Sequence, residues 1–291
     1  MHSKTEIIRR TIPDGCQLPE HIHPLLSRIY LARGITNEAE LGRELDDLPA
    51  PSTISGTAEA ARLLHQHMRD GNRILIVGDF DADGATSCAL AVLALRAMGA
   101  EQVDYLVPNR FEYGYGLTPE IVAVALGKSP DLIVTVDNGI SSVAGVAAAA
   151  DAGVPVVITD HHLPGAELPA AAAIVNPNLP DGGSCGQNLA GVGVLFYLLM
   201  ALRSRLREQE WFTQRGLEEP NLAGFLDLVA LGPVADVVPL DKINRILVHQ
   251  GIRRIRAGLC RPGIKMLLQV AGRNIERIVA SEIGFVVGPR L

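Results

Sequence analysis

Acidic and histidine side chains stand at the ends of three short apolar runs in this sequence. They are Asp79, Asp81 and Asp83 in LIVGDFDADG, Asp137 in LIVTVDNG, and Asp160, His161 and His162 in VVITDHH. Carboxylates brought together repel one another and cannot all stay ionised without a cation. Carboxylate oxygens with one or two imidazoles suit Mn²⁺ or Mg²⁺. Two such ions can activate a water in phosphoryl hydrolysis, so the residues predict a two-metal phosphoesterase site.

Each of these motifs has a simpler interpretation when it is taken alone. A single Asp at a strand end usually caps a helix or forms a turn, and a pair of histidines is usually a surface or core feature. Here three such motifs each follow a predicted strand, and the simple interpretation would have to hold for all three at once, which makes it much less convincing. The DxDxD pattern also occurs in calcium loops, but the terminal Glu of that pattern is absent here.

A fourth candidate ligand is Asp236, in LVALGPVADVVPL. Its neighbours are apolar, so an unpaired carboxylate would be costly to bury at this position. We expect a further metal ligand here. The alternative is an Asp at a helix end that caps the following segment.

The elements that would position these residues alternate along the chain. Short β-branched runs predict strands at 73–79, 103–108, 132–137, 155–160 and 172–177, and helical patterns lie between the first four at 84–99, 117–127 and 141–153. Thr118 and Pro119 are a suitable cap and first residue for the second of these helices. The order predicts an α/β fold, a parallel sheet flanked by helices on both faces. Ligands bind beyond the carboxyl ends of such strands, which gathers the acids at one edge.

The flanking segments are expected to be helical. Residues 23–35 and 57–71 have apolar residues at helical spacing, a further helix start is expected at Thr36, and later helices are expected at about 189–208, 221–236 and 241–257. We therefore expect a helical N-terminal lead-in at 1–70 and a catalytic domain at 71–260. Residues 261–291 are expected to begin a linker to a further C-terminal domain.

The composition excludes few classes of function. The net charge of −6 argues weakly against nucleic-acid binding, yet nine basic residues and one acid, Glu276, lie between Lys242 and Arg277. Four widely spaced cysteines without a CxxC pair favour a reducing compartment. No apolar signal core and no uninterrupted apolar run of about 18 residues is present, so we expect a cytoplasmic protein without a membrane span.

Taken in order, these motifs resemble the DHH phosphoesterases, and within them the RecJ single-strand-specific DNA exonucleases. The resemblance covers essentially the whole chain and rests on RGI at 33–35, GDFDADG, PNRFEYGYGL, VDNG, TDHH, VNPN, LAGVGV, GPVADVVPL and FVVGPRL. It implies metal-dependent hydrolysis of single-stranded DNA from the 5′ end to 5′-mononucleotides, in DNA repair and recombination. It also implies single-stranded DNA as partner, with a single-strand-binding protein and a helicase as further candidates.

Two other functions remain open at this point. A DHH phosphodiesterase that acts on short oligoribonucleotides, cyclic dinucleotides or nucleoside bisphosphates would share the same ligands. The long lead-in and GPVADVVPL favour RecJ over it. A metal-free scaffold that binds DNA would have lost ligand residues, and here every ligand position is filled. The RecJ enzymes continue beyond the position of Leu291 into further domains, which puts the activity of this chain alone in doubt.

The resemblance implies a role for each site residue. The implied metal ligands, to Mn²⁺ or Mg²⁺, are Asp81, Asp83, Asp137, His161 and Asp236, with Asp137 as the bridge. Among the implied catalytic residues, Asp79 holds a water at the metal site. His162 contacts the scissile phosphate or protonates the leaving group, and Asp160 orients a histidine.

Two arginines are expected to bind substrate. Arg110, in PNRFEYGYGL, suits a substrate phosphate because a guanidinium can bind phosphate through two parallel hydrogen bonds. Arg290, together with the arginines at 253, 254 and 256, is expected to line the start of a DNA groove. The alternative for all of them is an arginine on a solvated surface. The loop from Asp181 to Gln187 has no assigned role.

Overall fold

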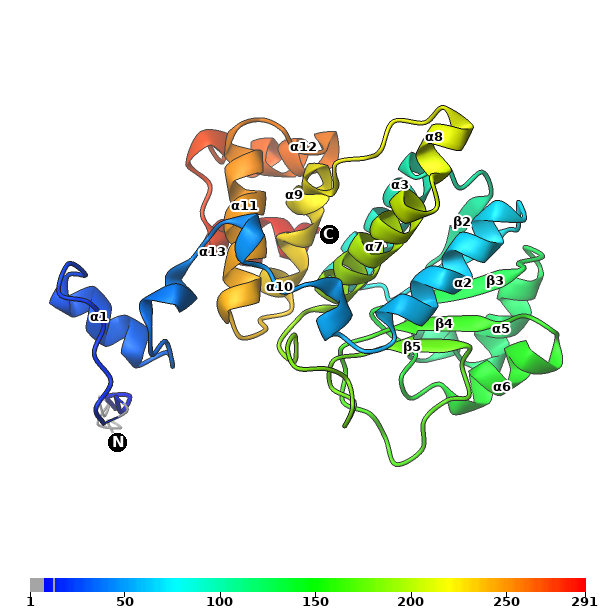
Figure 1. The fold of residues 1–291 in the computed structure, drawn as a ribbon, viewed down its shortest axis with the longest axis horizontal. Coiled ribbons are helices and arrows are strands. Elements are labelled where there is room, and N and C mark those ends of the chain that lie inside the picture. The colour runs from blue at the N-terminus through cyan, green and yellow to red at the C-terminus, as the bar shows by residue number, and fades with distance from the viewer. Residues whose placement is uncertain (1–7, 13) are drawn as a thin grey trace.

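The computed structural model describes residues 8–12 and 14–291, and Figure 1 shows its fold. Within these residues a five-stranded sheet has the order β2-β1-β3-β4-β5, and every pair of neighbours is parallel. The strands are β1 (Ile74–Gly78), β2 (Val103–Leu106), β3 (Leu132–Val136), β4 (Val156–Thr159) and β5 (Ala173–Val175). The predicted parallel α/β sheet is confirmed, with each strand inside its expected range.

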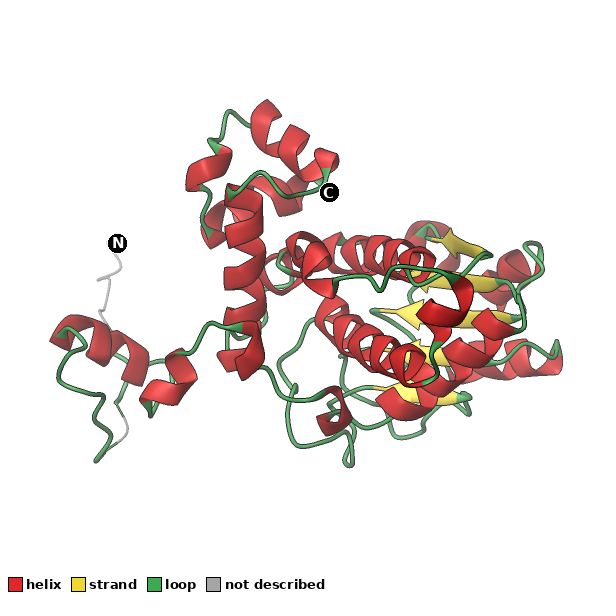
Figure 2. Ribbon diagram, turned by 45° about the horizontal axis from the view of Figure 1, so that its top comes forward, coloured by secondary structure: helices red, strands yellow, loops and turns green. Residues whose placement is uncertain are grey.

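Side chains alternate between the two faces along each strand, so a strand of apolar residues gives the sheet two apolar faces. Helices cover both faces. Ile76 and Val134 belong to the larger apolar cluster, whereas Val77 and Ile133 belong to a separate one on the opposite face. The helices that contribute to the larger cluster include α2 (Thr57–Arg69), α3 (Ala82–Ala97) and α7 (Gly191–Glu208), and those of the other are α5 (Pro119–Leu126) and α6 (Val143–Asp151). Figure 2 shows the sheet between these two layers.

Local signals start α5 where the sequence predicts. The Thr118 hydroxyl accepts a hydrogen bond from the backbone N–H of Ile121 at 3.3 Å, and Pro119 is the first residue of α5. Both features of the expected cap are therefore present.

The predicted helix at 221–236 is wrong as a single element, because it is broken into η4 (Leu222–Phe225), α9 (Leu226–Val229) and α10 (Leu231–Ala235). Pro233 has no N–H to donate to the preceding turn, so a continuous helix would lose a hydrogen bond there. The expected helix from Thr36 is a short 3-10 turn, η1 (Glu38–Leu41), whose N-cap is Asn37.

The remaining helical elements lie outside the sheet layers or connect them. Those that precede α2 are α1 (Pro24–Leu31), η2 (Leu45–Asp47) and η3 (Pro51–Thr53), and α4 (Arg110–Tyr113) lies between β2 and α5. After α7 they are α8 (Trp211–Arg215), α11 (Lys242–Arg256), α12 (Pro262–Val270), η5 (Ile275–Arg277), α13 (Ala280–Glu282), the π-helical turn η6 (Ile283–Val287) and η7 (Gly288–Arg290).

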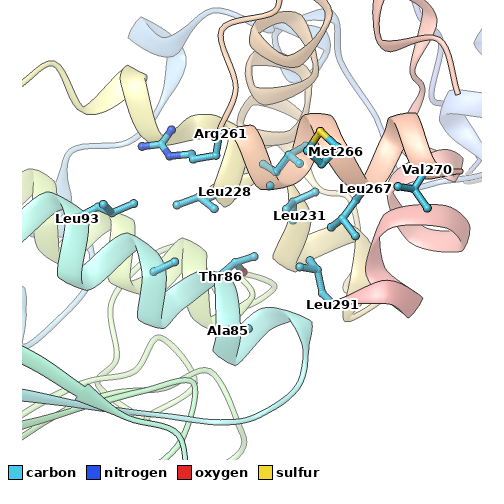
Figure 3. A pocket seen from close by; sticks show the side chains of 13 residues that line it. Ala85, Thr86, Leu93, Leu228, Leu231, Arg261, Met266, Leu267, Val270 and Leu291 are labelled. Atoms are coloured by element: carbon cyan, nitrogen blue, oxygen red, sulfur yellow. The ribbon is translucent and has the colours of Figure 1, made fainter. Parts of the chain in front are cut away.

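Residues 261–291 fold back onto the helices before them. The buried carboxylate of Asp227, in α9, accepts a hydrogen bond from the Arg261 backbone N–H at 2.7 Å and forms an ion pair with the Arg261 guanidinium. An apolar pocket of about 530 Å³ lies between α3 and α12, and Leu291 points into it in Figure 3. A domain division at residues 70 and 260 stays a prediction. No described helix is both long and apolar enough to span a membrane.

Candidate metal centre

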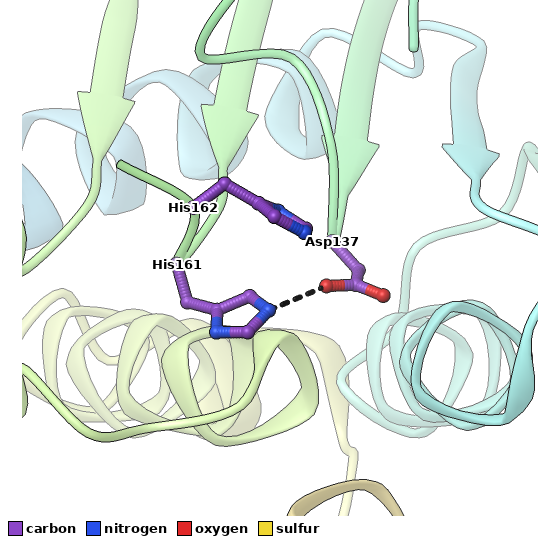
Figure 4. A group of neighbouring side chains, drawn as sticks. All are labelled: Asp137, His161 and His162. Carbon is purple, nitrogen blue, oxygen red and sulfur yellow. Dashed lines mark ion pairs between the residues drawn. The ribbon is translucent and has the colours of Figure 1, made fainter. Parts of the chain in front are cut away.

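The predicted site residues follow the carboxyl ends of neighbouring strands. Asp79 comes directly after β1, Asp137 directly after β3, and Asp160 directly after β4. Figure 4 shows Asp137, His161 and His162 where the chain leaves β3 and β4, with both histidines on the same side as Asp137. Because β1, β3 and β4 are adjacent in the sheet, three motifs far apart in the sequence meet at one edge.

Seven acidic and histidine residues at this edge form three overlapping groups. In each group one ligand atom per residue lies within 4.8 Å of the others. The groups are Asp79, Asp81 and Asp137; Asp137, His161 and His162; and Asp83, His161 and Asp236. Asp137 and His161 each belong to two groups, so the arrangement can hold more than one cation with shared ligands.

Asp236 joins the site from a different part of the chain. It is the C-cap residue directly after α10, and its Oδ2 lies 3.6 Å from His161 Nε2. Nε2 of the same histidine lies 3.2 Å from Oδ1 of Asp137. All five residues expected to be ligands are thus within reach of a shared metal cluster, and their individual roles remain a prediction.

Asp137 is held in an uncommon conformation and environment. Its φ of 62° lies in the left-handed region, and its side chain is almost fully buried. Burial, followed by the nearby charges of Asp81 and Asp160, raises the pKa of this carboxyl well above its usual value. Among the described residues, Oδ1 of Asp137 accepts no hydrogen bond. This buried oxygen faces His161 Nε2 at 3.2 Å without forming a hydrogen bond, so it suits a divalent cation, which would supply further positive charge.

The N-terminus of α7 neutralises part of the charge on Asp83. Its two carboxylate oxygens accept hydrogen bonds from the backbone N–H groups of Gly191 at 2.6 Å and Val192 at 3.1 Å. Helix N-termini favour anions because their N–H groups lack partners within the helix. Burial and the charge of Asp137 nevertheless raise the pKa of Asp83 well above its usual value. The carboxylate therefore needs more positive charge than the helix gives.

Asp81 combines the two interpretations that its motif allows. Its Oδ1 accepts a hydrogen bond from the backbone N–H of Gly84 at 3.0 Å, so the residue is the N-cap of α3. It also belongs to the ligand group of Asp79 and Asp137. A carboxylate has two oxygens, so a cap and a metal contact are compatible in one side chain.

Asp160 orients His162. Its Oδ1 accepts hydrogen bonds from His162 Nδ1 at 2.7 Å and from the backbone N–H of His161 at 2.8 Å, and its Oδ2 accepts one from Ile140 N–H at 2.9 Å. Burial opposes ionisation of Asp160, but the hydrogen bonds, led by that from His162, lower its pKa below the usual value. In return, the hydrogen bond with Asp160 raises the pKa of His162 to about 9.

Comparison with known proteins supports this description. The model of the DHH family, N-terminal domain, matches residues 73–232, which contain the sheet and most of the ligand groups. The chain belongs to the DHH family. It is 55% and 58% identical over its whole length to the single-stranded-DNA-specific exonucleases RecJ of Escherichia coli (strain K12) and Dickeya dadantii (strain 3937). The chain covers 50% of each of these relatives, about half their length.

A solved structure shows the same fold. A crystal structure of exonuclease RecJ bound to manganese superimposes with a TM-score of 0.71 and 38% identity, over 84% of this chain and 58% of that chain. Asp236 lies just beyond the residues that match the DHH family model. Its place in the site therefore comes from the fold of α10.

Three polar residues of this DHH core were missed as site residues from the sequence. The hydroxyl of Tyr115 lies 3.2 Å from His162 Nδ1 and donates to the backbone carbonyl of Asp137 at 3.3 Å. Asn176 donates to the backbone carbonyl of His162 at 2.9 Å, and Asn178 donates to that of His161 at 2.5 Å. The motifs YGYGL and VNPN contain these residues, but no spacing rule identifies which side chains turn toward the histidines.

The site also depends on two positions without a side chain. A Cβ at Gly191 would lie 2.5 Å from Oδ1 of Asp137, and a Cβ at Gly232 would lie 2.1 Å from Oδ1 of Asp83. Helices α7 and α10 can approach the carboxylates only because both residues are glycine. LAGVGV and LGPV carry these glycines in the sequence.

Two exposed aromatic rings lie beside the acids. Phe80, between Asp79 and Asp81 in the sequence, is 44% exposed, and Phe111, in α4, is 86% exposed. Their ring centroids are 6.2 Å apart in an edge-to-face arrangement. Both rings thus expose part of their surface beside the acids.

The arginines expected to bind substrate are only partly described. The side chain of Arg110 lies outside the described residues. Arg290 donates from Nη1 to the backbone carbonyl of Val286 at 2.8 Å, within a turn that packs against α10. Arg254 and Arg256 of α11 donate to the backbone carbonyls of Leu259 and Ile278. These guanidinium groups therefore stabilise local structure, and their expected contact with DNA stays a prediction.

Proposed function

We propose that this chain carries the catalytic centre of a metal-dependent exonuclease that degrades single-stranded DNA from the 5′ end to 5′-mononucleotides. The observation that carries the proposal is the sharing of Asp137 and His161 between overlapping ligand groups at the carboxyl edge of the sheet. Shared ligands can hold two cations close together, as two-metal phosphodiester hydrolysis needs. The relatives named as single-stranded-DNA-specific exonucleases support single-stranded DNA as the substrate. We propose DNA repair and recombination as the setting.

The donor set fits Mn²⁺ or Mg²⁺. Carboxylate oxygens outnumber imidazoles at the site, as these cations prefer. The residues that would hold the ions are Asp81, Asp83, Asp137, His161 and Asp236, with Asp137 shared between them. When bound, two such ions lower the pKa of a water and stabilise charge on the phosphate and the leaving oxygen.

The other residues of the site act on the substrate side of the reaction. The hydrogen bond with Asp160 raises the pKa of His162 to about 9, which favours a protonated ring that can donate a proton or a hydrogen bond to the departing 3′ oxygen. Asp160 holds the ring of His162 in place, and the Tyr115 hydroxyl contacts it from another direction. We assign Asp79 to positioning a water, and Arg110 to a substrate phosphate.

The surroundings of the site favour a single strand. Phe80 and Phe111 are exposed beside the acids, and an unpaired base can stack on such rings, whereas a base inside a duplex is already stacked. A cavity of about 310 Å³ beside His162 and Asp160 gives room for part of a nucleotide. DHH phosphodiesterases of small substrates remain the alternative, with short oligoribonucleotides, cyclic dinucleotides or nucleoside bisphosphates as substrates.

The test uses the full-length protein with Mn²⁺ and oligonucleotides labelled at either end. We expect mononucleotides to be released progressively from the 5′ end of single strands, with little cleavage of duplexes and none after chelation of the metal. Asp137→Ala is the matched negative control. Hydrolysis of cyclic dinucleotides or short oligoribonucleotides in place of long single strands would overturn the proposal in favour of the alternative.

The division of the chain and its partners belong to the same proposal. We assign residues 71–260 to the catalytic domain, 1–70 to the lead-in and 261–291 to the start of a linker, and limited proteolysis of the full-length protein would test these boundaries. A single-strand-binding protein and a helicase are the proposed protein partners. The cytoplasm is the proposed compartment, in keeping with four free cysteines among the described residues.

A further inference from the structure

Residues 8–12 and 14–35 form a small unit with its own apolar centre. Leu18, Leu31 and Ile35 are buried together there, and α1 contributes one wall. Figures 1 and 2 both show this unit beyond α11, on the side of the molecule toward which the carboxyl ends of the strands point. The unit therefore lies on the side of the metal centre, although it contributes no residue to the ligand groups.

Four arginines line a groove on this unit. Arg9, Arg10, Arg28 and Arg33 surround a space of about 560 Å³, and Leu25, Ile29 and Ala32 complete its walls. All four arginines are exposed. The whole segment 8–35 contains two acids, Asp14 and Glu20, in a chain whose net charge is −6. The groove is thus a concentrated basic surface on a chain whose net charge is negative.

The guanidinium groups of this groove differ from those of α11. In the part of the chain that the structure describes, none of the four forms an ion pair or a side-chain hydrogen bond. Arg253, by contrast, lies 4.0 Å from a carboxylate oxygen of Glu44, and Arg256 donates to a backbone carbonyl at 2.8 Å. Like charges gathered in one groove repel one another, and a bound polyanion would relieve that repulsion.

We propose that this arginine groove binds the phosphate backbone of single-stranded nucleic acid, as a second contact surface remote from the metal centre. The inference rests on the proposed function, because it treats the occupant as the part of the strand that has not yet reached the site. Guanidinium groups bind phosphates through paired hydrogen bonds. The exposed side chains of Leu25 and Ile29 offer apolar surface to sugars and unpaired bases between those phosphates.

A single strand suits this geometry better than a duplex. A flexible single strand can bend between the groove on α1 and the carboxyl edge of the sheet, whereas a short duplex is stiff. An acidic peptide could also neutralise the arginines, but nothing about a peptide explains why the groove lies on the side of the metal centre. Binding at two separated surfaces would raise the affinity for long strands through the effective concentration of the second contact.

The test compares charge reversals in the full-length protein. The variant Arg28→Glu with Arg33→Glu changes two exposed arginines of the groove. The control Arg62→Glu with Arg69→Glu makes the same change in net charge on α2, outside the groove. Binding of a fluorescent oligothymidylate is measured in EDTA at increasing KCl concentrations, so that no cleavage is needed. Thermal melting checks that each variant is folded.

We expect the groove variant to bind the long strand about 10-fold more weakly near physiological salt, and the control to bind like wild type. The slope of log K against log salt should become shallower by about 1.4, since each phosphate contact on a single strand contributes about 0.7. The variant with lysine at positions 28 and 33 should keep most of the affinity, because it keeps the charge.

Three results would overturn the proposal. The first is a folded groove variant whose affinity for the strand and salt slope are unchanged. The second is an equal loss of affinity in the control variant. The third is an acidic peptide probe that binds the arginines while the charge reversal leaves the affinity for the strand unchanged. Because the assay measures binding without metal, its outcome is separate from the exonuclease test. A protein that binds strands through the groove but releases no nucleotides would contradict the proposed function alone.

Discussion

Gly191, the first residue of α7, allows a sharp test of how the metal centre is built. A Cβ at this position would lie 2.5 Å from Oδ1 of Asp137 and 2.6 Å from its Cβ. Non-bonded carbon atoms in contact stay about 3.5–4.0 Å apart, so the added methyl group would overlap Asp137 by roughly 1 Å. Either α7 moves away from the end of β3 or Asp137 rotates. Rotation displaces the carboxylate that two ligand groups share, and movement of α7 displaces the N–H groups that bind Asp83.

The expected effect of Gly191→Ala on activity is much larger than its effect on stability. A misplacement of about 1 Å costs on the order of 100-fold in rate, so kcat/KM on single-stranded DNA should fall by about that factor. Metal–ligand distances tolerate about 0.2 Å, so the apparent affinity for Mn²⁺ should fall as well. Overpacking costs about 1–3 kcal/mol of unfolding free energy. The higher helix propensity of alanine offsets up to about 1 kcal/mol of this.

The assay measures the exonuclease rate of the full-length protein over a range of Mn²⁺ concentrations, together with thermal melting in EDTA. Gly263→Ala is the matched control, because Gly263 lies in the first turn of α12 and a Cβ there would have no atom within 4 Å. We expect the control to keep its rate. If Gly191→Ala also kept the wild-type rate and Mn²⁺ dependence, the close packing of α7 on Asp137 would not define the site, and the reasoning would be refuted.

Three further substitutions test single parts of the site. Asp137→Ala should abolish hydrolysis and remove the stabilisation by Mn²⁺, which is about 2.7 kcal/mol at a hundredfold excess over Kd; near-normal turnover at matched metal would contradict the shared role. In the metal-free protein, NMR titration should show His162 losing its proton near pH 9. In Asp160→Asn the pKa of His162 should fall toward 6.5, because the hydrogen bond that raises it is weakened. An unchanged pKa in this variant would mean that Asp160 is not the cause. Asn178→Ala removes the hydrogen bond to the His161 carbonyl and should weaken Mn²⁺ binding about 10-fold; equal affinity by calorimetry would count against a positioning role for Asn178.

The sheet and the gathering of the acids could be predicted because both follow from local patterns. The β-branched runs fix the strands, and parallel strands place their carboxyl ends at one edge. Asp79, Asp137 and Asp160 therefore had to lie together once β1, β3 and β4 were adjacent. The break between α9 and α10 was missed because helical spacing alone does not show how strongly Pro233 interrupts a helix.

Other parts of the site depend on contacts between distant segments. Nothing around Gly191 in the sequence shows that its N–H meets Asp83 or that its missing side chain makes room for Asp137. The hydrogen bonds from Asn176 and Asn178 to the histidine carbonyls likewise depend on how the loop after β5 returns to the end of β4. Packing of this kind is set by tertiary structure, which periodicity and propensity do not contain.

The charge balance of the finished site explains why the fold places so many acids together. Burial raises the pKa of both Asp83 and Asp137, although Asp83 accepts two hydrogen bonds from the N-terminus of α7. His162 makes a short hydrogen bond to Asp160, and its charge also acts on Asp137 and Asp236, but the pKa of both carboxyls stays raised. His161 is shared between Asp137 and Asp236. One imidazole cannot balance the negative charge of these two carboxylates together with that of Asp83. Among the described groups, those around Asp83, Asp137 and Asp236 thus leave a deficit of positive charge, which divalent cations would fill.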